Sequence, residues 1–152
     1  MTPEIGITST PVIDLTAGTH GTIFAVAMSK DNSGNYHQRL HALDITTGAE
    51  LTGSPVTIQA SFPGTGANSS NGNVIFAPAQ YLERAGLLLM NHVIYTSWGS
   101  HCDYQPYTGW LISYNESTLQ QASVLNVTPN GGDGAIWMSG AGLAADSARA
   151  LR

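Results

Sequence analysis

The sequence predicts an all-β fold made of antiparallel strands. Its 17 glycines divide the 152 residues into short apolar runs. Almost no segment shows the i, i+3, i+4, i+7 apolar spacing of an amphipathic helix. One pattern of strands also occurs twice, and such a repeat indicates that each copy folds as one supersecondary unit. We therefore expect consecutive β units within a single domain.

Apolar runs bounded by turn residues give the strands in chain order. The predicted strands are Thr10–Asp14, Thr22–Met28, His37–Asp44, Val56–Gln59, Gly86–Met90, Val93–Trp98, Trp110–Asn115, Ala122–Asn126 and Gly140–Ala145. The connection PGTGANSSNGN, Pro63–Asn73, is long and polar and is expected to be a surface loop. The only helical candidate is a turn or two within PAQYLERA, Pro78–Ala85.

The repeat has a constant offset of 71 residues. Gly21–Phe24 aligns with His92–Tyr95, and Leu40–Asp44 aligns with Leu111–Asn115. The opening of the first unit, STPVID at 9–14, returns as AGLAAD at 141–146. The chain therefore holds two units and the opening strand of a third.

Two segments of the repeat resemble a known family. Leu40–Gly48, LHALDITTG, is similar to the third strand and turn of the quinoprotein β-propeller blade, and Gly132–Gly140, GDGAIWMSG, resembles its blade-opening segment. The resemblance implies four-stranded antiparallel blades and says little about activity, because one fold hosts many functions. It divides the single domain 1–152 into blade 1 at about 5–62, a linking loop at 63–76, blade 2 at about 77–130, and a third opening strand at 131–146.

A propeller closes with roughly four to eight blades, so about two and a half blades form only a partial propeller. Open sheet edges pair readily with other chains. We therefore expect a homo-oligomer that covers these edges by sharing strands. The leading functional hypothesis is a self-associating scaffold or binding module with a rim site for a small-molecule ligand. Too few blades are present to enclose a quinone, and quinone-dependent dehydrogenation is not expected.

Charge and hydropathy exclude other classes of partner. The net charge is −5 with five Lys and Arg, which is too few for a surface that neutralises phosphates, so nucleic acid is not expected as a partner. The longest apolar run, Leu87–Met90, is too short to span a membrane, and the N-terminus lacks the features of a signal peptide. We therefore expect a soluble, cytoplasmic chain, although the family it resembles is often exported. Cys102 is the only cysteine, which excludes an intramolecular disulfide.

The stretch SWGSHCDYQPYTGW, 97–110, holds the main candidate site. It joins two strands of the second unit at the rim where successive blades connect, so Asp133 and His37 are expected nearby. We predict His37, His101, Cys102 and Asp133 as metal ligands, with His101 and Asp103 as catalytic residues. Nitrogen and sulfur donors suit zinc or another divalent metal, and a metal-bound water would permit hydrolysis. The alternative function is thus a metal-dependent hydrolase of activated esters or phosphoesters.

The loop residues could instead have a purely structural role, which is the alternative to the catalytic interpretation. Asp103 would accept backbone hydrogen bonds and Cys102 would be buried as a small apolar group. Elsewhere, His37 and His41 lie on one strand about 13 Å apart and cannot share an ion. His20 and His92 fall at the first hairpin turns of their units, His92 where a two-residue turn favours glycine. They are interpreted as turn substitutions, with a meeting at one rim as the alternative.

Overall fold

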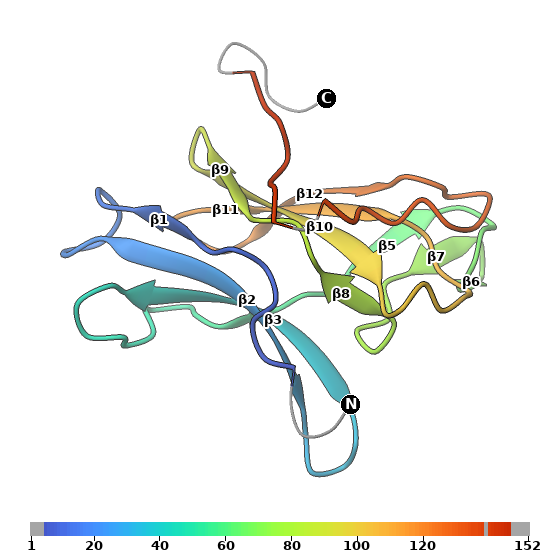
Figure 1. Cartoon of the computed structure of the whole chain (residues 1–152), viewed down its shortest axis with the longest axis horizontal. Coiled ribbons are helices and arrows are strands. Elements are labelled where there is room, and N and C mark those ends of the chain that lie inside the picture. The colour runs from blue at the N-terminus through green and yellow to red at the C-terminus, as the bar shows by residue number, and fades with distance from the viewer. Residues whose placement is uncertain (1–4, 139, 147–152) are drawn as a thin grey trace.

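The structure, a computed structural model, describes residues 5–138 and 140–146. Within these ranges the chain forms antiparallel β-sheets and no helix, which confirms the all-β prediction. The first sheet is a meander of β1 (Val12–Asp14), β2 (Thr22–Lys30), β3 (Tyr36–Asp44) and β4 (Val56–Thr57), in that order. It lies on the left of Figure 1. No helix in the described residues is long and apolar enough to cross a membrane.

The second sheet repeats this meander. Its strand order is β12-β11-β10-β8, with β9 also paired to β10. The strands are β8 (Tyr81–Glu83), β9 (Leu88–Met90), β10 (Val93–Ser100), β11 (Trp110–Asn115) and β12 (Gln121–Asn126). Most predicted strands therefore appear within a residue or a few of their expected ends.

The segment 63–73 lies at the surface as predicted, but the prediction that it is only a loop is wrong. It takes part in a small third sheet of β5 (Ser61–Pro63), β6 (Ser69–Ser70) and β7 (Asn73–Ile75), ordered β5-β7-β6. Backbone contacts with a distant segment hold it, since the N–H of Gly66 donates to the Pro129 carbonyl at 2.8 Å. A Cβ on Gly64 would lie 2.1 Å from that same carbonyl oxygen, so only glycine permits the approach.

Two further expectations also differ from the structure. The helical turn in 78–85 is wrong, because its centre forms β8, which pairs with the end of β10 and buries Tyr81 and Glu83. The strand predicted at Gly140–Ala145 is reduced to an isolated parallel bridge between Gly142 and Gly86. In both cases contacts with β10 and its neighbours decide the conformation rather than local propensity.

The 71-residue repeat is visible in the hydrogen bonds. Asp44 and Asn115 end β3 and β11, and Oδ1 of each accepts the N–H groups two and three residues further on. The carbonyl of each accepts the N–H four residues on, from Gly48 and Leu119, at 2.8 and 2.9 Å. Both of these residues have positive φ, 70° and 55°. The two units therefore end their third strands in the same turn.

The inner edge of each sheet is interrupted at the same place. β8 and β9 pair with opposite ends of β10, while β1 pairs with the start of β2 and Gly6 bridges to Met28 near its end. The opening segments of the first unit and of the predicted third unit both contact the chain between β8 and β9. The N–H of Leu87 donates to the Thr10 carbonyl, and the N–H of Gly86 donates to the Ala141 carbonyl, both at 2.9 Å.

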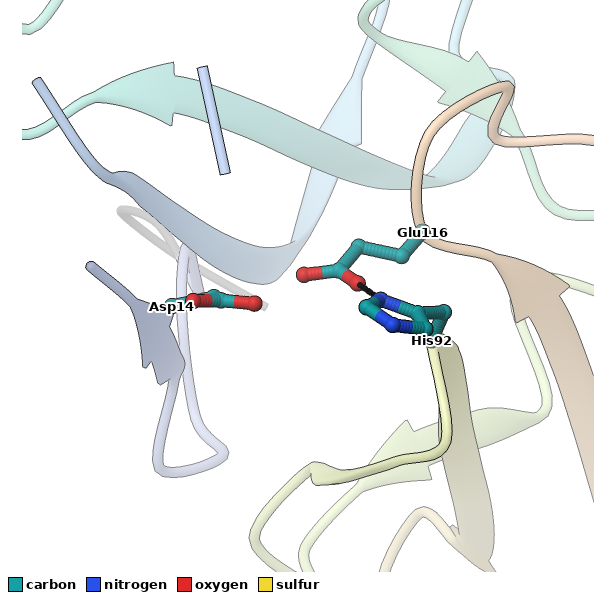
Figure 2. Close-up of side chains that lie close together, drawn as sticks. All are labelled: Asp14, His92 and Glu116. Atoms are coloured by element: carbon teal, nitrogen blue, oxygen red, sulfur yellow. Dashed lines mark hydrogen bonds and ion pairs between the residues drawn. The ribbon is translucent and has the colours of Figure 1, made fainter. Parts of the chain in front are cut away.

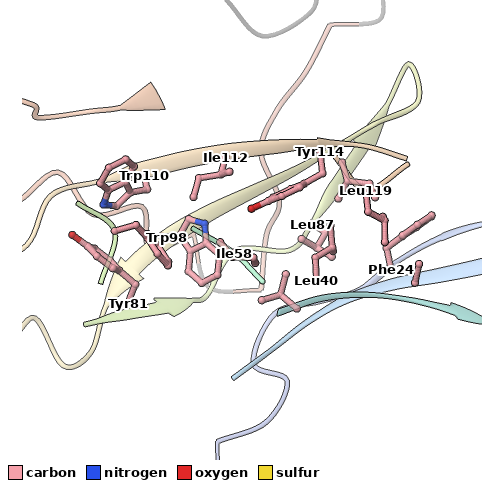
Figure 3. Packing of buried hydrophobic residues seen from close by; sticks show 14 of the residues in the cluster. Phe24, Leu40, Ile58, Tyr81, Leu87, Trp98, Trp110, Ile112, Tyr114 and Leu119 are labelled. Carbon is pink, nitrogen blue, oxygen red and sulfur yellow. The ribbon is translucent and has the colours of Figure 1, made fainter. Parts of the chain in front are cut away.

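One apolar core joins the sheets (Figure 3). Phe24 and Leu40 of the first sheet enter it opposite Ile112 and Tyr114 of the second. At its other end Trp98 and Trp110, cross-strand partners on β10 and β11, are fully buried. They pack around the ring of Phe76 at centroid distances of 4.9 and 5.9 Å. The two tryptophans therefore belong to the core.

Candidate metal centre between the two sheets

A histidine and two carboxylates gather where the first sheet faces the turns of the second. Asp14 is the last residue of β1, His92 lies in the turn between β9 and β10, and Glu116 follows β11. One potential ligand atom from each lies within 4.8 Å of the others. Figure 2 shows the three side chains converging from separate elements.

The turn at Asn91–His92 fixes the position of the histidine. Met90 pairs with Val93, so only these two residues connect β9 to β10. Their φ values of 52° and 60° are those of a type I′ turn, in which non-glycine residues are strained. The His92 carbonyl accepts the Glu116 N–H at 2.9 Å, and its Nδ1 lies 2.8 Å from Glu116 Oε2. The His92 side chain is nevertheless 78% exposed, which leaves its ring open to solvent.

Glu116 carries the unusual atom of the site. Its side chain is only 4% exposed. Oε2 is paired with His92, but Oε1 is buried and has no hydrogen-bond partner. Figure 2 shows this second oxygen on the side that faces Asp14. A buried carboxylate oxygen without a donor costs free energy, and a bound cation would remove that cost.

Asp14 supplies a second anionic group. Its Oδ1 accepts the hydroxyl and the N–H of Thr16, both at 2.7 Å. These two hydrogen bonds, the hydroxyl first, hold the pKa of Asp14 below its ordinary value, and the adjoining Glu116 side chain and the charge of His92 lower it further. The carboxylate is therefore ionised at neutral pH, and it adds negative charge beside Glu116.

The three residues line one pocket of about 440 Å³. The hydroxyl residues Thr16, Thr52 and Ser117 also line it. Its apolar lining residues include Phe24, Ala42, Leu51 and Leu119. The volume matches the range of small-molecule sites, about 300–1,000 Å³.

The donor set suits a divalent transition metal. Two carboxylates and one imidazole are ligands that zinc accepts at bond lengths of about 2.0–2.2 Å. Ligand atoms around such an ion lie up to about 4 Å apart, so the group needs only a small contraction. The exposed His92 ring has the freedom to make it. Three protein ligands also leave a coordination position for water or substrate, as in catalytic sites.

The predicted rim loop, residues 97–110, contributes no residue to this group of three. It does lie beside Asp133, as expected. The N–H of Asp133 donates to the Tyr107 carbonyl at 2.9 Å, and its Oδ1 accepts from Gln105 at 2.8 Å. Asp103 accepts the hydroxyl of Tyr107, which with the nearby charge raises the pKa of that tyrosine to about 12. These polar partners occupy the carboxylates of the loop.

The other predicted ligands have separate surroundings. His37 Nε2 lies 3.1 Å from Asp31 in the hairpin of the first unit. Cys102 is exposed and not buried as the structural interpretation expected. His101 Nε2 is buried without a partner, and burial lowers the pKa of its imidazole. In the part of the chain that the structure describes, Asp14, His92 and Glu116 form the group compatible with a metal, and it includes none of the predicted ligands.

From the sequence, His92 was interpreted as a turn residue, with a meeting with His20 at one rim as the alternative, and Asp14 and Glu116 were not among the predicted site residues. A signal was present, because the histidine–acid pair of the second unit stands one residue later in the repeat than His20 and Asp44 of the first. Nothing local indicated that Asp14 would face this pair. The chain matches no family model, no curated protein and no solved structure.

Proposed function

We propose that this protein is a metal-dependent hydrolase whose centre is Asp14, His92 and Glu116. The observation that carries the proposal is Glu116 Oε1, a buried carboxylate oxygen without a hydrogen-bond partner on the wall of a pocket. Asp14 and His92 place two more ligand atoms within 4.8 Å. The pocket beside the group gives a substrate room to reach the open coordination position.

Each residue has a role in this proposal. The two carboxylates neutralise the ion, and the exposed imidazole completes the ligand set at the mouth of the pocket. A bound divalent ion lowers the pKa of a coordinated water towards neutrality and polarises a substrate oxygen. Thr16 orients the Asp14 carboxylate through the two hydrogen bonds that it donates.

Metal titration tests the site. We expect wild-type protein to bind one Zn²⁺ or Mn²⁺ per chain in isothermal titration calorimetry, and His92→Ala to weaken binding by about 10–100-fold. His20→Ala is the matched control, because His20 also pairs with an acid, Asp44 at 2.7 Å, and lies outside the pocket. No saturable binding, or equal losses in the two variants, would refute the metal centre.

The second candidate function is a self-associating scaffold built as a partial propeller. It is supported by the two antiparallel sheets, of four and five strands, and by the meeting of the unit openings at Thr10, Leu87 and Ala141. Exposed apolar side chains on outer strands, Ile13 and Leu125 among them, favour contact with another copy. Light scattering at several concentrations tests this function, and a monomer at every concentration would exclude it.

A further inference from the structure

We propose that the substrate of this site is an uncharged carboxylic ester and not a phosphoester. The inference rests on the proposed hydrolase function and adds the substrate class to it. It follows from the two carboxyl groups at the centre, from the lack of Lys and Arg among the described lining residues, and from the apolar residues of the wall.

Within residues 5–138 and 140–146, no Lys or Arg side chain lines the pocket. The described Lys and Arg residues are Lys30, Arg39 and Arg84, and none of them lines it. Lys30 lies over the Tyr36 ring at 5.1 Å, and Arg39 donates to Ser29 at 2.8 Å. Sites that bind phosphate esters use Arg or Lys to make charge-assisted hydrogen bonds.

The charge of the loaded centre leads to the same conclusion. Asp14 and Glu116 place two carboxyl side chains at the centre. A phosphomonoester dianion would have to approach them in a chain whose formal net charge is −5. An uncharged ester meets no such barrier, and the ion still polarises its carbonyl oxygen.

The wall of the pocket supplies the remaining recognition. Phe24 is 1% exposed and Leu119 4% exposed, so both are fixed in the core and present only a small apolar surface. This surface suits a short acyl chain, at about 0.8 kcal/mol per buried methylene. Thr52 and Ser117 offer hydroxyl groups to the polar side of the ester.

The reaction is ordinary ester hydrolysis. Asp14, His92 and Glu116 would hold the ion, which would activate a water molecule at neutral pH. That water would lose one proton to solvent and add to the carbonyl carbon as hydroxide. The tetrahedral intermediate collapses, the bond between the acyl carbon and the alcohol oxygen breaks, and the departing oxygen takes a proton from solvent. One water and one ester thus give one carboxylate, one alcohol and one proton.

The test compares two substrates on the metal-loaded chain. We expect the wild type to exceed His92→Ala, at the same total metal, by at least about 100-fold in kcat/KM for p-nitrophenyl butyrate and by less than about 2-fold for p-nitrophenyl phosphate. The comparison with His92→Ala removes the intrinsic difference in reactivity between the two esters and the hydrolysis by free ions or surface groups. An equal or larger loss with p-nitrophenyl phosphate would overturn the substrate class.

A charge-insertion variant gives a second readout. Thr52→Lys adds a cation to the pocket wall and should strengthen inhibition by inorganic phosphate by about 10-fold. Thr57→Lys, on the exposed strand β4 outside the pocket, is the matched control and should change inhibition less than about 2-fold. If both variants respond equally, the pocket does not select by charge and the inference fails.

The outcomes separate this inference from the proposed function. Absence of metal binding in the titration refutes the centre itself. Metal binding with a preference for phosphate refutes only the ester class. Metal binding without hydrolysis of either substrate refutes both the hydrolase and its substrate.

Discussion

His20 with Asp44 in the first unit and His92 with Glu116 in the second form two similar ion pairs, at 2.7 and 2.8 Å. In the first unit one acid has two tasks. Oδ1 of Asp44 accepts three hydrogen bonds within the strand-ending turn, and Oδ2 binds the histidine. Every oxygen of that carboxylate is thus used by the fold.

In the second unit the two tasks fall to different residues. Asn115 accepts the hydrogen bonds of the turn, and Glu116, one position later, binds the histidine. Glu116 Oε1 therefore takes no part in the turn and is directed towards Asp14 (Figure 2). An acid thus becomes available for a ligand when a neighbouring side chain satisfies the turn in its place.

The largest effect that we predict is on the free energy of unfolding, and it concerns Glu83 of the second unit. Glu83 pairs with Trp98 on β10, and Ile7, next to the bridge from Gly6 to Met28, holds the corresponding place beside β2. Ile7 is 55% exposed, whereas Glu83 is 2% exposed. Burial raises the pKa of Glu83 to about 8, against the opposing hydrogen bonds from Ser9 and Ser97. Since its folded pKa exceeds its ordinary value, the free energy of unfolding is highest at acidic pH and falls as pH rises towards 8.

Glu83→Gln should remove this fall in stability. At pH 8.5 the free energy of unfolding of the variant is expected to exceed that of wild type by up to about 5 kcal/mol. At pH 4 the two free energies of unfolding should be similar. Urea titrations at both pH values measure the difference. A wild-type stability that stays constant between pH 5 and pH 8.5 would contradict the burial of this carboxyl.

Neutralising one acid in each unit is expected to separate their roles. Glu116→Gln should weaken metal binding at least about 100-fold, or about 3 kcal/mol, because it removes a charged ligand. Asp44→Asn keeps an acceptor oxygen in the turn and lies outside the pocket, so metal affinity should stay within about 2-fold. Calorimetric titration of both proteins checks this, and comparable losses would mean that Glu116 has no special role.

The turn positions Gly48 and Leu119 extend the comparison to packing. Both have positive φ, but the Leu119 side chain is buried in the core and lines the pocket. Leu119→Ala should cost about 2–3 kcal/mol through the cavity that it leaves. Gly48→Ala should cost about 1 kcal/mol through backbone strain alone, because a Cβ there meets no atom within 4 Å. Thermal unfolding measures both, and a larger loss at Gly48 would contradict this order.

The smallest effect is expected from the swap Asn115→Asp. Its side-chain oxygen accepts the same hydrogen bonds as Asp44 does in the first unit. We expect a change below about 0.5 kcal/mol in the free energy of unfolding. A loss of more than about 1 kcal/mol would show that the added charge repels Glu116 strongly, and the two turns would then not be interchangeable.

The sequence allowed the all-β class and most strands of the two units to be predicted, because alternating apolar residues and turn residues are local signals. It did not allow β8 to be predicted, since Ala79, Leu82 and Arg84 favour a helix and only pairing with β10 makes the strand. The small third sheet was missed for a similar reason. Its Gly- and Ser-rich chain is ordered by contact with the distant Pro129 backbone.

The candidate site was missed because its parts come from two sheets. The predicted residues His101, Cys102 and Asp103 form a conspicuous cluster in sequence, while Asp14 and Glu116 are unremarkable singly. Local composition cannot show which turn of one sheet faces which strand end of another. The displacement of the histidine–acid pair by one residue was readable, and in a repeat protein such a departure identifies positions that the fold itself does not require.

Asp14 belongs to the first sheet, whereas His92 and Glu116 belong to the second. With a single cysteine the chain has no internal disulfide to tie the sheets together. Under the proposed function an ion would act as a removable cross-link between them. At a free metal concentration of 100 times Kd it would add about 2.7 kcal/mol to the unfolding free energy. The resistance of this protein to unfolding would then follow the supply of divalent metal around it.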